Sequence, residues 1–161
     1  MLTKRRLSHA QGYLELGMIT EAAAELAGIT GPERSTPGVM AVRIAVLQEQ
    51  GAWPDLRELA RDFVQQVPGE AAAWVTWAYA TRRADSIDAA EKILLEAEQK
   101  HPAEPTIQFN LGCYACQRGD LAEARRRVDR AIDLDAKFAA LAEQDADLAP
   151  LREQKKERRS R

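Results

Sequence analysis

A turn position recurs every 34 residues along this chain of 161 residues. Gly17, Gly51, Asp85 and Gly119 occupy it, and each lies between two stretches whose apolar residues have helical spacing. The sequence therefore contains four copies of one helix-turn-helix unit. A repeat of this length predicts an all-α solenoid, in which each unit buries its apolar face against its neighbours.

Alignment of the four units places small or apolar residues in the same columns. In the second helix of each unit, one column holds Ala22, Leu56, Ala90 and Ala124, and another holds Leu26, Ala60, Leu94 and Val128. A column of mostly small residues in the first helix holds Ala10, Ile44, Ala78 and Gly112. The two second-helix columns are four residues apart, so they predict one helical face that is buried in every unit.

The helix ends carry their own signals. We expect first helices at 4–16, 37–50, 70–83 and 105–117, and second helices at 20–29, 54–67, 87–99 and 121–133. Pro54 and Pro105 suit the first turn of a helix, where a missing N–H leaves nothing unpaired. Asp120 and Glu123 match a capping box, in which both carboxylates accept hydrogen bonds from N–H groups of the first turn. Asp85 is expected to adopt the left-handed conformation that glycine adopts in the other turns.

The later units also resemble a known family. The residues that carry the resemblance are Pro68, Trp74, Pro102, Leu111-Gly112, Tyr114, Gly119, Ala124 and Ala131-Ile132-Asp133-Leu134-Asp135. In them the chain resembles the tetratricopeptide repeat family over roughly residues 1–136, most strongly over 70–136. The resemblance implies a right-handed α-solenoid of four antiparallel helix pairs, with repeats at about 1–35, 36–69, 70–103 and 104–136. We expect residues 137–161 to form a capping helix, interrupted near 145–147, and a charged basic tail.

Composition restricts the class of protein. With 45% apolar and 30% charged residues, the chain is expected to be globular. No apolar run approaches the ~18 residues that cross a bilayer, so we expect no membrane span. No apolar signal segment follows Met1, and this predicts a cytoplasmic protein.

Charge is distributed unevenly along the chain. The first six residues carry +3 and residues 152–161 carry +4, so the net charge of −2 leaves −9 for residues 7–151. An acidic body argues against a nucleic-acid-binding groove. We expect the basic tail to be solvated and frayed, and we expect a second basic cluster on a second helix to be solvated as well. That cluster consists of Arg125, Arg126, Arg127 and Arg130.

No pattern for catalysis or metal binding stands out. The two cysteines, Cys113 and Cys116, are spaced i, i+3 in the middle of an expected helix, where no helix N-terminus lowers a thiol pKa. A zinc site needs about four ligands, and there is no second cysteine pair. Phosphate-binding loops, nucleophile elbows and zinc-protease motifs are absent from the sequence. We therefore expect no enzyme activity, no small-molecule substrate, no cofactor and no metal.

In the tetratricopeptide family, the first helices line a concave groove that holds a partner. The resemblance therefore implies a groove lined by Gln48, Thr76, Tyr79, Arg82, Arg83, Phe109, Asn110, Cys113 and Gln117. These positions do not reproduce the set of Lys, Asn and Arg with which one subfamily captures chaperone carboxylates. Tyr79 and Phe109 are either groove anchors or packing residues between repeats. We expect Trp74 and Trp77 to lie in the core and Trp53 to staple a helix pair.

The function implied by the resemblance is that of a non-enzymatic protein–protein interaction module for a peptide or amphipathic helix of a partner protein. A small chaperone of the secretion type, which shields an apolar client segment, is the alternative. Self-association through an exposed repeat face is a third interpretation, and nucleic-acid binding by the basic tail is a fourth.

Overall fold

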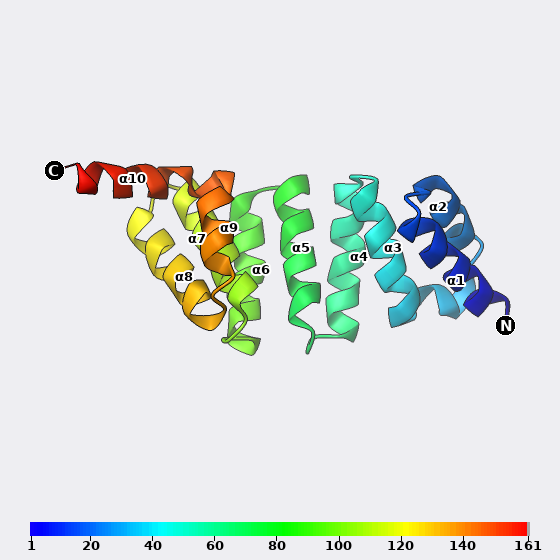
Figure 1. Cartoon of the computed structure of the whole chain (residues 1–161). Helices are drawn as coiled ribbons and strands as arrows, with labels where there is room; N and C mark the ends of the chain where they lie inside the picture. Colours follow the sequence, from blue (N-terminus) through cyan, green and yellow to red (C-terminus); the bar gives the residue numbers. More distant parts are fainter. Residues whose placement is uncertain (161) are drawn as a thin grey trace. The chain divides into compact units, whose positions relative to one another are not determined.

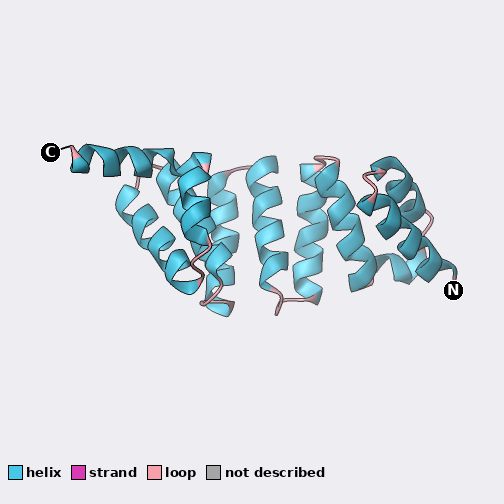
Figure 2. Ribbon diagram, in the orientation of Figure 1, coloured by secondary structure: helices cyan, strands magenta, loops and turns pink. Residues whose placement is uncertain are grey.

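The structure is a computed structural model, and it describes residues 1–160. These residues form ten α-helices and two short 3₁₀ helices, and no β-strand occurs among them (Figure 2). They divide into two compact units, one from Met1 to Ser86 and one that begins at Ile87. No helix within residues 1–160 combines the length and the apolar character that crossing a membrane requires.

The first unit consists of five α-helices (blue to green in Figure 1). Their bounds are α1 Leu2–Glu15, α2 Ile19–Ala27, α3 Pro37–Glu49, α4 Trp53–Gln66 and α5 Ala71–Ala84, with the 3₁₀ helix η1 at Gly31–Ser35. Consecutive helices pack on one another, and α1 also contacts α3. The 3₁₀ helix begins soon after α2 ends, so the second helix of the first repeat is short, as the Gly and Pro residues there predict.

The second unit also contains five α-helices. Their bounds are α6 Ile87–Lys100, α7 Pro105–Gln117, α8 Leu121–Leu134, α9 Phe138–Gln144 and α10 Ala149–Arg159, with the 3₁₀ helix η2 at Ala146–Leu148. Helix α7 packs against α8 and η2, and α10 packs against α8. Residues 152–159 of the expected basic tail are helical, and Arg161, its last residue, lies outside the described residues.

The hydrophobic columns predict the buried faces correctly. Ala22, Leu56, Ala90 and Ala124 are completely buried, and Leu26, Ala60, Leu94 and Val128 are buried as well. The first-helix column of Ala10, Ile44, Ala78 and Gly112 is also buried. The ends of α1 to α8 all lie within two residues of the predicted ends. The 3.6-residue period and the signals at the helix ends are therefore together sufficient to locate the helices and their buried sides in this chain.

Three of the predicted turns share one geometry. Gly17, Gly51 and Gly119 have φ angles of 72°, 64° and 83°, in the left-handed region that favours glycine. In each turn the glycine N–H donates to the carbonyl three residues earlier, and the next N–H donates to the carbonyl five residues earlier. This is the Schellman arrangement, which satisfies carbonyl groups at the end of the first helix.

The prediction for Asp85 was wrong. Its φ and ψ are −135° and −90°, and no non-glycine residue in 1–160 has a positive φ. Its N–H donates to the carbonyl of Thr81, as in a regular helix. Only Asp85 and Ser86 separate α5 from α6, whereas three residues separate the helices at the glycine turns. The shorter connection needs no left-handed residue, a conformation that costs a non-glycine residue roughly 1–2 kcal/mol.

The capping box at α8 is only half formed. Oδ1 of Asp120 accepts a hydrogen bond from the N–H of Glu123 at 3.1 Å, as predicted. The N–H of Asp120 donates to the carbonyl of Ala115 instead of to Glu123. The Glu123 carboxylate is therefore not used for capping, and it binds arginine side chains of its own helix.

Candidate interaction surface

A partly exposed aromatic and cationic group lies at the junction of α4 and α5 in the first unit. The rings of Trp53 and Tyr79 meet edge to face, with centroids 5.5 Å apart and planes at 77°. The guanidinium carbon of Arg83 lies 4.7 Å from the Trp53 ring centroid and 6.0 Å from that of Tyr79. Tyr79 is 40% exposed, and Arg83 is exposed as well. We call this group the Trp53–Tyr79–Arg83 surface.

The local sequence explains how these side chains come together. Tyr79 and Arg83 are four residues apart on α5, so they lie on the same face of that helix. Trp53 begins α4 directly after the Gly51 turn, and α4 packs against α5. The partly buried Trp53 ring packs against a core cluster with residues of both α3 and α4, as expected of a residue that staples this helix pair. Sequence reasoning did not place Trp53 among the binding residues, because its contact with Tyr79 is tertiary.

The other predicted groove residues of the first unit have different environments. Gln48, on α3, is exposed, while Thr76 and Arg82, on α5, are half-buried. The Thr76 hydroxyl donates to the carbonyl of Ala72 in its own helix at 3.0 Å. Within this unit the structure therefore assembles Tyr79 and Arg83 with Trp53, while Gln48 and Thr76 lie outside that group.

In the second unit, two predicted groove residues are covered. Phe109 is 6% exposed and Cys113 is 3% exposed. The Phe109 ring lies 5.2 Å from that of Phe138, the first residue of α9. Phe109 therefore belongs to the core, whereas Tyr79 lies on the surface. The expectation that Phe109 and Cys113 offer contact area to a partner is corrected, because the C-terminal segment packs over α7.

Two further predicted residues of α7 border that segment. Asn110 is half-buried, and Gln117 is exposed with its side-chain amide donating to the carbonyl of Asp147 at 2.9 Å.

The other two tryptophans, Trp74 and Trp77 on α5, differ in burial. Trp74 is buried, and its indole N–H donates to the carbonyl of Pro68, while Trp77 is half-buried with its ring 5.9 Å from that of Trp74.

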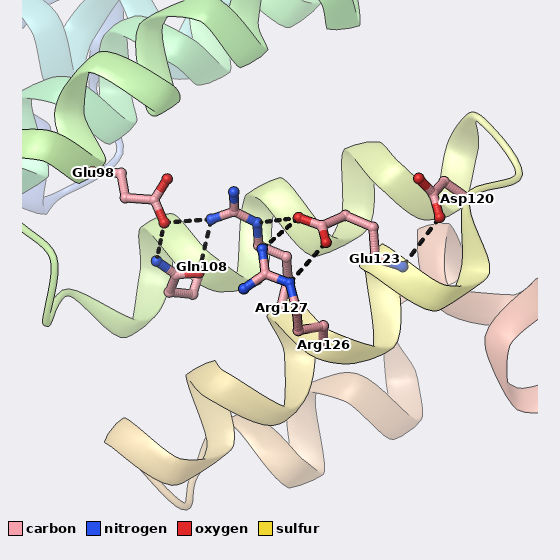
Figure 3. A network of polar contacts seen from close by, with 6 residues as sticks. All are labelled: Glu98, Gln108, Asp120, Glu123, Arg126 and Arg127. Atoms are coloured by element: carbon pink, nitrogen blue, oxygen red, sulfur yellow. Dashed lines mark hydrogen bonds and ion pairs between the residues drawn. The ribbon is translucent and has the colours of Figure 1, made fainter.

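A polar network whose central members, Gln108 and Arg127, are buried crosses the second unit (Figure 3). Nη1 of Arg127 donates to Oε1 of Glu98, 2.5 Å away on α6, and to Oε1 of Gln108, 2.9 Å away on α7. Nε of Arg127 donates to Glu123 on its own helix, and Gln108 donates to Glu98. The expectation that Arg127 is solvated was wrong: it is 8% exposed, because its side chain points between three helices. Arg126 and Arg130 are exposed, as expected.

Two carboxyl groups in this network have lowered pKa values. Hydrogen bonds from Arg126 lower the pKa of Glu123 to about 2, and Arg127 adds to this effect against the opposing effect of burial. Burial alone would raise the pKa of Glu98, but hydrogen bonds from Gln108 and Arg127 and the charges of Arg127 and Arg126 outweigh it, so the pKa is lowered. Both groups are therefore carboxylates at neutral pH, and the network is structural.

A small cluster with metal-ligating groups lies where α7 meets η2. Sγ of Cys113 and carboxylate oxygens of Asp145 and Asp147 lie within 4.8 Å of one another. These are the residues that could hold a divalent cation. However, Asp145 already caps η2 by accepting from the N–H of Asp147 at 2.9 Å. Burial raises the pKa of the Cys116 thiol, which lies outside the cluster, and the charge of Asp147 acts in the same direction. We assign the cluster to capping, because the Asp145 carboxylate already accepts a backbone N–H at the start of η2.

Each unit also contains a cleft. One of about 530 Å³ in the first unit is lined on its polar sides by Arg34, Arg43, Asp55, Glu58 and Asp62. Another of about 230 Å³ in the second unit is lined by Val128, Ile132, Leu148 and Leu151, together with Arg125, Asp129, Glu143, Arg152 and Lys155. None of the predicted groove residues lines either cleft, and both clefts mix cationic and anionic side chains.

The repeated helix pairs, the glycine turns and the C-terminal helices define an all-α helical-repeat fold that resembles the tetratricopeptide fold. Solved structures of MamA, a protein of tetratricopeptide-like fold, are similar to it. An RS-1 MamA double mutant matches with a TM-score of 0.74 at 14% identity, over 84% of this chain and 76% of that one. An AMB-1 MamA matches with a TM-score of 0.68 at 18% identity, over 95% of this chain and 80% of that one.

At these identities the likeness to MamA concerns the fold alone. A search of curated proteins finds no match to the sequence, and no protein-family model matches it. The chemistry of a partner is therefore inferred from the surface of this chain.

Proposed function

We propose that this protein is a non-enzymatic interaction module that binds a peptide or an amphipathic helix of another protein. The observation that carries the proposal is the Trp53–Tyr79–Arg83 surface on the first unit, in which Tyr79 and Arg83 are exposed. Tryptophan, tyrosine and arginine are the residue types that contribute most to binding energy at protein interfaces. They are grouped here on a rigid pair of packed helices, so little conformational freedom is lost when a partner binds.

The tetratricopeptide-type fold supports the same proposal. In tetratricopeptide proteins, the first helix of each repeat contacts the partner. Tyr79 and Arg83 lie on α5, which is the first helix of a repeat. We include Gln48, Thr76 and Arg82 in the proposed surface as flanking polar contacts. On the second unit, Asn110 and Gln117 are the predicted lining residues that are not buried.

Site-specific crosslinking tests the proposal. A photoreactive phenylalanine analogue at position 79 should crosslink to a partner protein in the native cell, and mass spectrometry identifies that partner. The matched control carries the analogue at position 62, an exposed site on the second helix α4. Tyr79→Ala should then weaken the affinity for the purified partner by about 1–3 kcal/mol. Equal crosslinking from both positions, or an unchanged affinity, would show that this surface is not the binding site.

Crosslinking and two further measurements separate the other interpretations. A single client that binds through an apolar segment would favour the small chaperone. Crosslinks between copies of this chain, with a concentration-dependent mass in light scattering, would favour self-association. Loss of salt-sensitive nucleic-acid binding on deletion of residues 152–161 would favour the basic tail as the functional element.

A further inference from the structure

The guanidinium of Arg83 is held in place without a carboxylate partner. Arg6, Arg57 and Arg61 of the same unit form ion pairs with glutamates of this chain. Arg83 instead contacts the rings of Trp53 and Tyr79, and no ion pair or hydrogen bond of its side chain occurs within residues 1–160. Its N–H groups are therefore available to a group from outside the chain, because the side chain is exposed.

Stacking on an aromatic ring prepares an arginine to bind an anion. The ring orients the planar guanidinium and removes water from one of its faces, while the N–H groups at its edge keep their geometry. A carboxylate matches two adjacent N–H groups of that edge and accepts two parallel hydrogen bonds. Lysine would not provide this match, because its ammonium group is a point charge on a flexible chain.

The surroundings of Arg83 restrict the rest of the ligand. Tyr79 presents a partly exposed ring beside Arg83, and this ring can be covered by an apolar side chain of the ligand. Residues 7–151 carry a charge of −9, so a strongly acidic segment is repelled at long range. A segment with a single carboxylate avoids most of this repulsion and still pairs with Arg83.

We infer that the partner segment carries one Asp or Glu next to an apolar residue and is otherwise neutral, and that its carboxylate binds Arg83 while the apolar side chain covers Tyr79. This inference rests on the proposed function and specifies the chemistry of its ligand. It differs from the chaperone-carboxylate clamp, whose residues are missing here, because one stacked arginine replaces the set of Lys and Asn side chains.

Peptide display tests the inference even while the natural partner is unidentified. The immobilised full-length chain selects binders from a library of random 12-residue peptides. The peptides that are enriched should contain one acidic residue beside an apolar one. The affinity of the best peptide and of its amide counterpart, with Asn for Asp or Gln for Glu, is then measured by fluorescence polarisation. Wild type should prefer the carboxylate peptide by about tenfold, a difference typical of one charge-assisted pair.

Two variants assign this preference to Arg83. Arg83→Gln should abolish the preference for the carboxylate peptide, and Arg83→Glu should reverse it toward a peptide with Lys at that position. Arg130→Gln, which changes an exposed arginine of the second unit, is the matched control and should retain the wild-type preference. Melting curves of all variants show that each remains folded.

The outcomes distinguish this inference from the proposed function. Enriched peptides that bind equally well as carboxylate and amide forms, or an Arg83→Gln variant that keeps the preference, would overturn the inference and leave peptide binding intact. If wild type enriches no peptide, the binding of a linear segment is itself wrong, and the inference fails with it.

Discussion

Nη1 of Arg127 lies 2.5 Å from a carboxylate oxygen of Glu98, and this ion pair joins α8 to α6 across 29 positions of sequence. Both side chains also bind Gln108 on α7, so three helices of the second unit share one polar network (Figure 3). Such a network stabilises a structure only when its members are satisfied, because an unpaired buried charge is costly.

Loss of the Arg127 guanidinium should therefore destabilise the second unit. Arg127→Met keeps a side chain of similar length but removes three hydrogen bonds to Glu98, Gln108 and Glu123. We expect a loss of about 2 kcal/mol in the free energy of unfolding, measured with urea. Arg130→Met, at an exposed position of the same helix, should cost less than about 0.5 kcal/mol. Similar losses in both variants would contradict the structural role of Arg127.

The network also predicts how stability depends on pH. The pKa of Glu123 is about 2 in the folded chain, below its ordinary value of 4.5. A lowered pKa in the folded state contributes stability above the unfolded pKa, and this contribution is lost as the pH falls through the folded pKa. The difference in unfolding free energy between wild type and Glu123→Gln should therefore shrink between about pH 4.5 and pH 2. Urea titrations at several pH values measure it.

A second variant identifies the cause of this pH dependence. Hydrogen bonds from Arg126 make the largest contribution to the lowered pKa of Glu123. In an Arg126→Gln background, the change from pH 4.5 to pH 2 should therefore be smaller. An equal pH dependence with and without Arg126 would show that another group lowers the pKa.

Close contact between α7 and α8 makes Gly112 sensitive to substitution. A Cβ atom at Gly112 would lie 2.9 Å from Cγ2 of Val128 and 3.3 Å from the carbonyl oxygen of Ala124. Gly112→Ala should cost about 1–3 kcal/mol, since overpacking displaces neighbouring atoms. Gly12→Ala is the control, because a Cβ atom there meets no atom within 4 Å. It should stabilise α1 by up to about 1 kcal/mol. Calorimetric melting should therefore show shifts of opposite sign, and shifts of the same sign would refute the packing argument.

The two aromatic residues whose roles the sequence leaves open should respond differently to truncation. Phe109→Ala removes a buried ring that packs on Phe138 and should cost about 3–5 kcal/mol of stability. Tyr79→Ala removes a partly exposed ring and should cost only about 1 kcal/mol, mainly its edge contact with Trp53. Urea unfolding of the two variants measures both effects, and equal losses would show that Tyr79 is also a core residue.

Much of the fold could be predicted from local signals. The column of Ala22, Leu56, Ala90 and Ala124 marks residues that are completely buried, because a 34-residue period repeats the same packing position. Gly17, Gly51 and Gly119 mark turns with positive φ, since glycine adopts that conformation without steric cost. The candidate site was predicted only in part, because Tyr79 and Arg83 were named while Trp53 was assigned to packing alone.

The amino-acid order by itself determined where the helices begin and end and which of their faces are buried, because hydrophobic period, capping and glycine conformation depend on neighbours within a few residues. Only the tertiary structure decided that Arg127 is buried, that Phe109 is covered and that Trp53 orients Arg83. Those environments are created by residues from other helices. The energies of burial and charge pairing therefore depend on residues that are distant in the sequence rather than on sequence neighbours.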